Sequence, residues 1–227
     1  MLHIFHGHDE RVEAGTTAFV RSVIAHASEP VMLTPITRKA CTDHKEGTNA
    51  FTYRRFLVPW MLHWEGWAVF MDGADMLLRD DVCQLAKLFN PYKAVQVVKH
   101  NYTSRYPRKY IGTTMEADNV GYERKNWASV MAINCSHFAW RTITPEFVRK
   151  ADPMDLLQLR FIPDDRIGEL PVEWNWLVDE FGANQDAKVL HFTAGIPGIP
   201  AHSDAPMAQE WTDSLLAASV CTAGFKA

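Results

Sequence analysis

Two acidic residues follow an apolar run near the middle of the sequence. The run Trp67–Met71 is rich in aromatic and aliphatic residues, which predicts a buried β-strand. Asp72 and Asp75 come directly after it, separated by Gly73 and Ala74. Carboxylates at the carboxyl end of a central strand lie where open α/β sheets bind ligands. Two such groups suit a hard divalent cation, Mg²⁺ or Mn²⁺, that also binds phosphate oxygens. The alternative is that both residues only end the strand and cap the next helix.

The segments around this strand alternate between strand-like and helix-like patterns. Residues 2–5, 12–26 and 30–35 read as strand, helix and strand, which implies a right-handed βαβ unit and a mostly parallel sheet. Further strands are predicted at 94–98, 126–134 and 188–195, and further helices at 51–64, 80–89, from Thr144-Pro145 onward, and at 207–220. The fold class is therefore α/β, with helices flanking a central sheet.

Composition limits the class of protein. With 227 residues and 47% hydrophobic content, the chain can bury the core of one large domain. The net charge of −4 gives no global basic field for nucleic acid or anionic membrane. No apolar stretch is long enough to span a bilayer and no signal peptide is evident, so we expect a soluble cytoplasmic protein. The cysteines are far apart, form no CxxC pair and are expected to be reduced: Cys41, Cys83, Cys135 and Cys221.

Several polar segments are candidate ligand contacts. Gly7, His8 and Asp9 follow the first strand, where a nucleotide base or ribose can bind; the alternative is a helix start whose acids complement the helix dipole. Arg55 lies in the predicted helix 51–64 and can clamp phosphate, although most helical arginines are only solvated. The polar loop 37–50 is either a functional lid or plain disorder.

Residues 99–110 combine basic and aromatic side chains without an acid. Such a stretch can stack bases or sugars and neutralise phosphates, or it is a solvated surface loop. Further along, Trp174 and Trp176 are two residues apart, so in an extended segment they form a platform for a sugar ring; packing in the core is the alternative. His191 can supply a nitrogen ligand to the same ion, although a lone His is more often structural.

The order of these motifs resembles the bacterial and phage-type glycosyltransferases of GT-A architecture, related in pattern to glycosyltransferase family eight. The matching segments span most of the chain and are Tyr53–Pro59, Glu65–Met76, Val98–His100, Arg124–Met131, Glu169–Trp176 and Leu190–Thr193. The resemblance implies one Rossmann-like GT-A domain over 1–227, with a nucleotide-binding half (1–100), an acceptor-side half (101–206) and a C-terminal helix (207–227).

The resemblance also implies roles for individual residues. Mn²⁺ or Mg²⁺ would bind Asp72, Asp75 and His191. The nucleotide-sugar donor, expected to be a UDP-sugar, would contact Gly7, His8, Asp9, Arg55, Asp72, Gly73, Ala74 and Ser129. The implied catalytic residues are Asp164, Asp165, Lys99 and Asn126, and the acceptor would contact Trp174 and Trp176.

One departure from the family concerns the metal motif. The usual motif is Asp-x-Asp, whereas two residues separate Asp72 from Asp75. Residues three apart in a straight strand point to opposite faces. Either Gly73 turns the backbone so that both acids reach one ion, or Asp75 alone ligates it.

The predicted function is metal-dependent sugar transfer from a nucleotide-diphosphate-sugar to an acceptor hydroxyl, with retention expected by analogy. A nucleotidyltransferase is an alternative, although no Gly-rich phosphate loop follows the first strand. A non-catalytic carbohydrate- or nucleotide-binding module is another. The acceptor stays open between a glycan, a lipid-linked sugar, a protein and a hydroxylated nucleobase in phage DNA, so nucleic acid is a possible partner.

Overall fold

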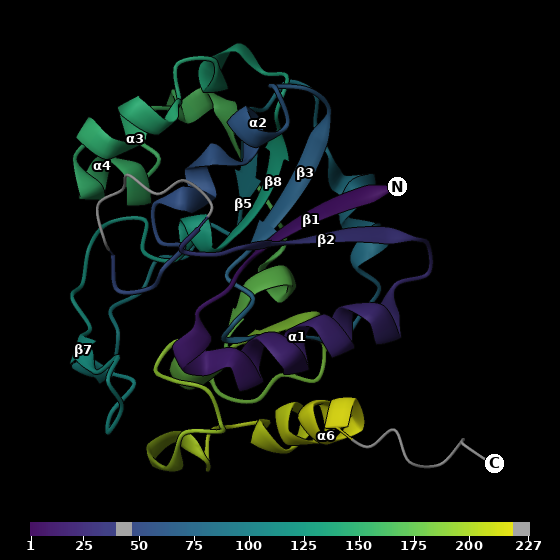
Figure 1. Cartoon of the computed structure of the whole chain (residues 1–227), viewed down its shortest axis with the longest axis vertical. Helices are drawn as coiled ribbons and strands as arrows, with labels where there is room; N and C mark the ends of the chain where they lie inside the picture. Colours follow the sequence, from purple (N-terminus) through teal and green to yellow (C-terminus); the bar gives the residue numbers. More distant parts are fainter. Residues whose placement is uncertain (40–46, 220–227) are drawn as a thin grey trace.

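A six-stranded sheet in the order β2-β1-β3-β8-β5-β9 forms the centre of the computed structural model (Figure 1). The structure describes residues 1–39 and 47–219. The strands of this sheet are β1 (Leu2–Gly7), β2 (Val31–Ile36), β3 (Trp67–Met71), β5 (Val95–Val97), β8 (Val130–Asn134) and β9 (Ile167–Glu169). Strand β1 is parallel to β2 and β3, and β5 is parallel to β9. Only β8 runs antiparallel to its neighbours in this sheet, so the predicted mostly parallel sheet is confirmed.

The central strands are buried on both faces. In β3, Ala68 and Phe70 belong to one core cluster, whereas Val69 and Met71 belong to another. This alternation follows from the two-residue period of a strand. A strand covered on both sides must be apolar throughout, which explains why it reads as a continuous hydrophobic run.

Helices cover the two faces of the sheet. Helix α1 (Glu13–His26) places Phe19 and Val23 in the same cluster as Val69. Helix α6 (Ala208–Ser219) packs against α1 on the side away from the sheet (Figure 1). The short helices α2 (Val58–Met61), α3 (Pro145–Lys150) and α4 (Pro153–Leu157) contribute to the other cluster.

Some predicted helices differ in type from the observed ones. The predicted helix 51–64 is a 3-10 helix (Arg54–Leu57) followed by the single turn α2, because Pro59 suits the first turn of a helix rather than its interior. The predicted helix 80–89 is a 3-10 helix (Val82–Leu88). Thr144 caps α3 as predicted, with its Oγ1 accepting a hydrogen bond of 3.2 Å from Phe147 N.

Two smaller sheets and a short helix complete the fold. One sheet has the order β10-β11-β4 and the other pairs β6 with β7. The bounds of these elements are β4 (Met76–Leu78), β10 (Trp176–Leu177), β11 (Val189–His191), β6 (Arg108–Lys109), β7 (Ala117–Asp118) and α5 (Val178–Phe181). The chain therefore leaves the large sheet after β3 and enters a small sheet as β4, and the turn between the two strands carries the predicted acidic pair.

Other predictions concern residues that are only partly described. Cys83 and Cys135 are free thiols, in line with reduced cysteines, whereas Cys41 and Cys221 lie outside the described residues. Residues 40–46 of the predicted lid loop 37–50 also lie outside the described part of the chain. Among the described residues, no helix combines the length and apolarity needed to cross a bilayer.

Candidate functional site

The turn between β3 and β4 brings two carboxylates to the same place. Gly73 has φ +71°, a left-handed conformation that glycine adopts without a steric cost. The backbone NH of Asp72 donates to Ser129 O at 2.9 Å, which ties the turn to the 3-10 helix (Trp127–Ser129) directly before β8. Asp72 and Asp75 are both buried, with 8% and 5% of their surface exposed. Of the two outcomes left open by their spacing, the turn favours the one in which both acids face one point.

Strand pairing brings a histidine to this turn from far along the chain. In the antiparallel pair β4–β11, His191 stands opposite Met76, and the next NH, of Phe192, donates to Asp75 O at 2.8 Å. His191 Nε2 consequently lies 3.5 Å from Asp75 Oδ1. One ligand atom each from Asp72, Asp75 and His191 falls within 4.8 Å of the others.

The donor atoms of this cluster fit a divalent cation. Among the described residues, Oδ1 of Asp72 and Oδ1 of Asp75 are buried and accept no hydrogen bond. Buried carboxylate oxygens without partners are costly unless a cation or a donor reaches them. Two carboxylates and one imidazole nitrogen form a mixed oxygen and nitrogen set that Mn²⁺ accepts, and Mg²⁺ accepts the oxygens. The predicted metal residues therefore come together, and Asp72 Oδ1 also lies in an ion pair with Arg55.

The two carboxyl groups differ in their electrostatic surroundings. Burial acts to raise both pKa values. For Asp72 burial outweighs the nearby Arg55 guanidinium, and the pKa is raised. For Asp75 the neighbouring His191 and the hydroxyl of Tyr110, which donates to Oδ2 at 3.0 Å, outweigh burial and hold the pKa below its usual value. Asp75 is therefore the better anionic ligand of the pair.

A buried asparagine orients the histidine. Asn175 is fully buried, and its Nδ2 donates to Ser129 Oγ at 2.8 Å and to Asn126 O at 3.2 Å. Its Oδ1 must therefore accept, and it lies 2.9 Å from His191 Nδ1. This network places a proton on Nδ1, and Nε2 faces Asp75. Such a partner is what a metal-binding histidine requires.

Arg55 provides a fixed positive charge beside the acidic pair. Its Nη1 lies 2.5 Å from Asp72 Oδ1 in an ion pair that lacks hydrogen-bond geometry. Backbone carbonyls of Thr52 and Ala128 accept from its Nε and Nη1 at 2.8 and 2.9 Å. The guanidinium carbon also lies 5.1 Å from the centre of the Phe70 ring. The 3-10 helix therefore directs this arginine into the site rather than to solvent.

One cleft of about 240 Å³ is lined by Asp72, Asp75, His191 and Arg55. Asn175 lies behind His191 and does not line it. Other polar residues at its surface are Thr48, Asn49, Thr52, Tyr53, Lys109, Tyr110, Asp118, Asn119, Tyr122, Lys125, Asn126, Ser129 and Thr193. The cleft thus combines a candidate cation site with several basic side chains, an arrangement suited to a polyanionic ligand.

The predicted residues after β1 have mainly local roles in this structure. A Cβ on Gly7 would stand 2.5 Å from Asp72 O, so glycine permits the close approach of β1 to the acidic turn. His8 Nδ1 lies 3.3 Å from Thr16 Oγ1. Asp9 caps a 3-10 helix and accepts from Arg11 and from the NH of Ala50, which lowers its pKa to about 2. Asp9 therefore lies at a helix start, as the alternative interpretation proposed. Contact of this loop with a nucleotide base stays a prediction.

The predicted catalytic residues separate into two groups. Asn126 has a left-handed backbone (φ 62°) and lines the cleft with Ser129. Lys99 lies outside the cleft, with its Nζ 5.6 Å from the centre of the Trp127 ring. Asp164 and Asp165 are exposed in a 3-10 helix (Asp164–Arg166) and do not line the cleft.

An ion pair on the surface accounts for one of these acids. Arg124 Nη2 lies 2.8 Å from each carboxylate oxygen of Asp164. Two further acids in α5, Asp179 and Glu180, are buried, and the charges of His191 and Asp75 act on Asp179. Sequence reasoning missed them because their helix is a single turn without a motif. Burial raises the pKa of Asp179 to about 6.

The predicted tryptophan platform is not assembled. Trp174 is 2% exposed and belongs to the core, where the Lys188 ammonium lies 5.1 Å from its ring centre. Trp176 is half-buried and its Nε1 donates to Gly182 O. The segment is not extended, because Trp174 lies in a 3-10 helix (Val172–Asn175) and Trp176 begins β10. The core-packing alternative therefore describes Trp174, and Asn175 between the two is the residue that serves the site.

Comparison with known proteins places the chain among relatives. No protein-family model matches it. "Protein CDI" of Arabidopsis thaliana is 30% identical over 227 residues, which cover 94% of this chain and 86% of that protein. The chain belongs to the Protein CDI family.

Solved structures with the same fold are glycosyltransferases. The bifunctional glycosyltransferase WbbM matches 94% of this chain with a TM-score of 0.69 at 14% identity, and the chain spans 49% of WbbM. The galactosyltransferase LgtC, in complex with donor and acceptor sugar analogues, matches with a TM-score of 0.61 at 15% identity, over 98% of both chains. These likenesses confirm the α/β fold of GT-A type that the resemblance in sequence predicts.

Proposed function

We propose that this protein is a metal-dependent glycosyltransferase that moves a sugar from a nucleotide-diphosphate-sugar to an acceptor hydroxyl. The observation that carries the proposal is the buried cluster of Asp72, Asp75 and His191, whose carboxylate Oδ1 atoms have no hydrogen bond within the described residues. The cluster lies at the end of a central strand in a cleft with basic side chains. The solved structures that share this GT-A fold, WbbM and LgtC, are glycosyltransferases, which supports the same reaction class.

The chain's own residues suggest how the reaction is supported. A divalent cation in this site would stabilise the negative charge that grows on the departing diphosphate. Asn175 holds the His191 imidazole with Nε2 toward the site, and Tyr110 holds Asp75. Arg55 is fixed against Asp72, so its charge is in place before the reaction and needs no reorganisation.

The donor and acceptor belong to the same proposal. A UDP-sugar is the expected donor, with Mn²⁺ favoured over Mg²⁺ because a nitrogen ligand is present. Asn126 and Ser129 line the cleft beside the metal residues and would contact the donor sugar. Retention of anomeric configuration follows only from the resemblance to family eight. The acceptor is a hydroxyl compound, with a glycan and a hydroxylated nucleobase both to be tested.

The experiment measures release of the nucleotide diphosphate from a panel of nucleotide sugars, with Mn²⁺ and with a chelator. We expect turnover of a preferred donor that the chelator abolishes and added Mn²⁺ restores. Asp75→Asn keeps the shape of the side chain but removes its charge, and it should abolish turnover. Asp213→Asn is the matched control, since this acid is exposed on α6 and does not line the cleft. A turnover rate that is unchanged both by the chelator and by Asp75→Asn would contradict the proposal.

A further inference from the structure

One side of the cleft is formed by a segment with little core of its own. Residues 104–119, the hairpin segment, contain the two-residue strands β6 and β7, and Figure 1 shows β7 at the edge of the molecule, away from the central sheet. Within this segment only Tyr110 and Met115 are buried. A two-stranded hairpin is marginally stable by itself in water, so other contacts must hold the segment in place. Its residues that line the cleft are Lys109, Tyr110, Ala117, Asp118 and Asn119.

A buried carboxylate in α5 holds the start of the hairpin segment. Glu180 Oε1 accepts a hydrogen bond from the Ser104 hydroxyl, and its Oε2 accepts one of 2.9 Å from the backbone NH of Arg105. Ser104 Oγ also accepts from Asn119 Nδ2 at 2.7 Å, which ties the far end of the segment to its start. Both carboxylate oxygens of Glu180 are therefore engaged by the hairpin segment.

The neighbouring acid reaches the same segment through a residue that follows His191. Asp179 is buried, and its Oδ2 accepts from the backbone NH of Ala194 at 2.9 Å. The carbonyl of Ala194 in turn accepts from the NH of Tyr110 at 2.6 Å. Tyr110 OH then donates to Asp75 Oδ2 at 3.0 Å. Asp179 thus supports a second anchor of the hairpin segment, and this anchor ends at a proposed metal ligand.

Two adjacent buried acids are costly unless hydrogen-bond donors and positive charges reach them. Burial raises the pKa of Asp179 to about 6, and the Glu180 charge adds to this increase. Burial also lowers the pKa of Lys109 and Lys125, and the Glu180 charge opposes this decrease in both. The acids and the groups around the cleft therefore stabilise each other, so the position of the hairpin segment depends on the acids.

We propose that Asp179 and Glu180 are positioning residues that hold the hairpin segment over the cleft, and that Tyr110 transmits this constraint to the Asp75 carboxylate. Neither acid lines the cleft, so both act through other residues. Without them the hairpin segment loses its anchors, and Asp75 loses the donor that orients it. The expected effect on turnover rests on the proposed function, whereas the effect on the hairpin segment does not.

Hydrogen exchange tests the first step of this proposal. It reports the protection of the Arg105 and Tyr110 amides, which donate to Glu180 and Ala194, with the amides of β3 as the reference for a folded core. In Glu180→Gln an NH₂ group replaces one acceptor oxygen. We expect exchange of these two amides to become roughly tenfold to a hundredfold faster, the effect of losing a hydrogen bond to a charged group. Asp179→Ala should act in the same direction, and exchange in β3 should stay native.

Titration with Mn²⁺ and release of the nucleotide diphosphate test the second step. We expect Glu180→Gln and Asp179→Ala to weaken Mn²⁺ binding by about tenfold, as for other residues that orient metal ligands, and to lower turnover. Asp179→Asn keeps an oxygen that can accept from the NH of Ala194, so its Mn²⁺ affinity should stay within about fivefold of native. This rescue by the amide separates positioning from a general loss of stability.

Two further variants keep the test independent of folding defects in α5. Ser104→Ala removes a partner of Glu180 at a half-buried position of the hairpin segment, and it should also speed up exchange there. Asp186→Asn changes an exposed acid in the loop after α5 and should leave exchange and Mn²⁺ affinity unchanged. Native exchange of the hairpin segment in all the folded Asp179, Glu180 and Ser104 variants would overturn the positioning role. Native Mn²⁺ affinity despite faster exchange would also overturn it.

The outcomes separate this inference from the proposed function. Faster exchange and weaker Mn²⁺ binding in the variants of a protein that transfers no sugar would support the positioning role and contradict glycosyl transfer. Transfer with native rate, native Mn²⁺ affinity and native exchange in every variant would support the function and contradict the positioning role.

Discussion

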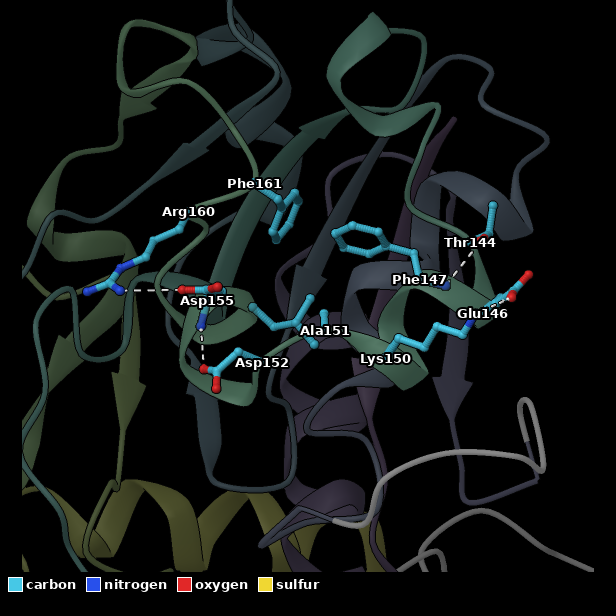
Figure 2. A pocket seen from close by; sticks show the side chains of 10 residues that line it. Thr144, Glu146, Phe147, Lys150, Ala151, Asp152, Asp155, Arg160 and Phe161 are labelled. Atoms are coloured by element: carbon cyan, nitrogen blue, oxygen red, sulfur yellow. Dashed lines mark hydrogen bonds and ion pairs between the residues drawn. The ribbon is translucent and has the colours of Figure 1, made fainter.

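Two hollows on this molecule differ in size and in chemistry. The hollow beside α3 and α4 has a volume of about 550 Å³, more than twice the 240 Å³ of the cleft above the acidic turn. Figure 2 shows its charged side chains on either side of two aromatic rings, Phe147 and Phe161, which meet edge-on at 6.2 Å between ring centres. Its charges are paired with one another: Lys150 with Glu146 at 2.7 Å and Arg160 with Asp155 at 3.4 Å.

The aromatic rings of this hollow belong to the packing of the core. Phe161 meets Trp140 and Phe56 edge-on, at 5.6 and 5.8 Å between ring centres. The Lys150 and Glu146 side chains are about two thirds exposed, at 68% and 66%. The hollow is therefore a depression where short helices meet, with every charge at its rim either solvated or satisfied.

The smaller cleft has the opposite character. It buries the carboxylates of Asp72 and Asp75, whose Oδ1 atoms accept no hydrogen bond from the described residues, although Arg55 forms an ion pair with Asp72. Lys109 and Lys125 also line it. Unpaired polar groups in a buried place cost stability, so a fold keeps them where a ligand completes them. This contrast in chemistry, rather than volume, is the reason for proposing the smaller cleft as the functional site.

The largest difference between the two hollows should appear when a metal ligand is removed. His191→Ala takes the nitrogen donor from the cleft, and we expect turnover of the preferred donor to fall by roughly 10²- to 10³-fold, the loss typical of one charge-stabilising group. Donor hydrolysis with Mn²⁺ measures this. Glu146→Ala, at the rim of the other hollow, should leave the rate unchanged. A comparable fall in Glu146→Ala would reverse the assignment of the two sites.

Truncating an aromatic residue of the larger hollow should affect stability alone. Phe161→Ala removes edge-on contacts with Trp140 and Phe56, and we expect a loss of about 2–3 kcal/mol in the free energy of unfolding, less than for a fully buried Phe. Denaturant unfolding measures it. Mn²⁺ and UDP affinity of the folded variant should stay native. A selective loss of ligand affinity without destabilisation would mean that this hollow binds a ligand.

An intermediate effect is expected from the residue that orients the histidine. Asn175→Ala removes the acceptor at His191 Nδ1, and the affinity for Mn²⁺ should fall by roughly 10- to 100-fold, as for other partners of metal ligands. Titration of Mn²⁺ by calorimetry checks this. Unchanged affinity would show that His191 keeps its orientation without Asn175.

The smallest effect should come from a paired charge at the rim of the larger hollow. Lys150→Gln breaks an exposed pair with Glu146 within one helix, and unfolding free energy should change by only about 0.3–0.5 kcal/mol. Urea unfolding at low and high salt measures this loss, which salt should reduce. A loss above about 1.5 kcal/mol would show that the pair does more than an exposed ion pair can.

Local patterns were enough to predict much of the framework. The apolar run Trp67–Met71 is strand β3, and the spacing of residues 12–26 predicts α1. The acids and the glycine after β3 form a turn with positive φ at Gly73, and both acids lie with His191 in a group that could hold a metal ion. Each of these features depends on neighbours within a few residues, so the sequence carries them directly.

The sequence by itself determined the elements of the α/β fold and the two carboxylates of the turn. The tertiary structure decided which distant groups join them: the β4–β11 pairing brought His191 to Asp75, and burial of Asn175 oriented it. It also left Asp164 and Asp165 on the surface and placed Trp174 in the core. The physical reason is that strand register and helix packing depend on the whole core, and a side chain's neighbours across a sheet cannot be read from its neighbours along the chain.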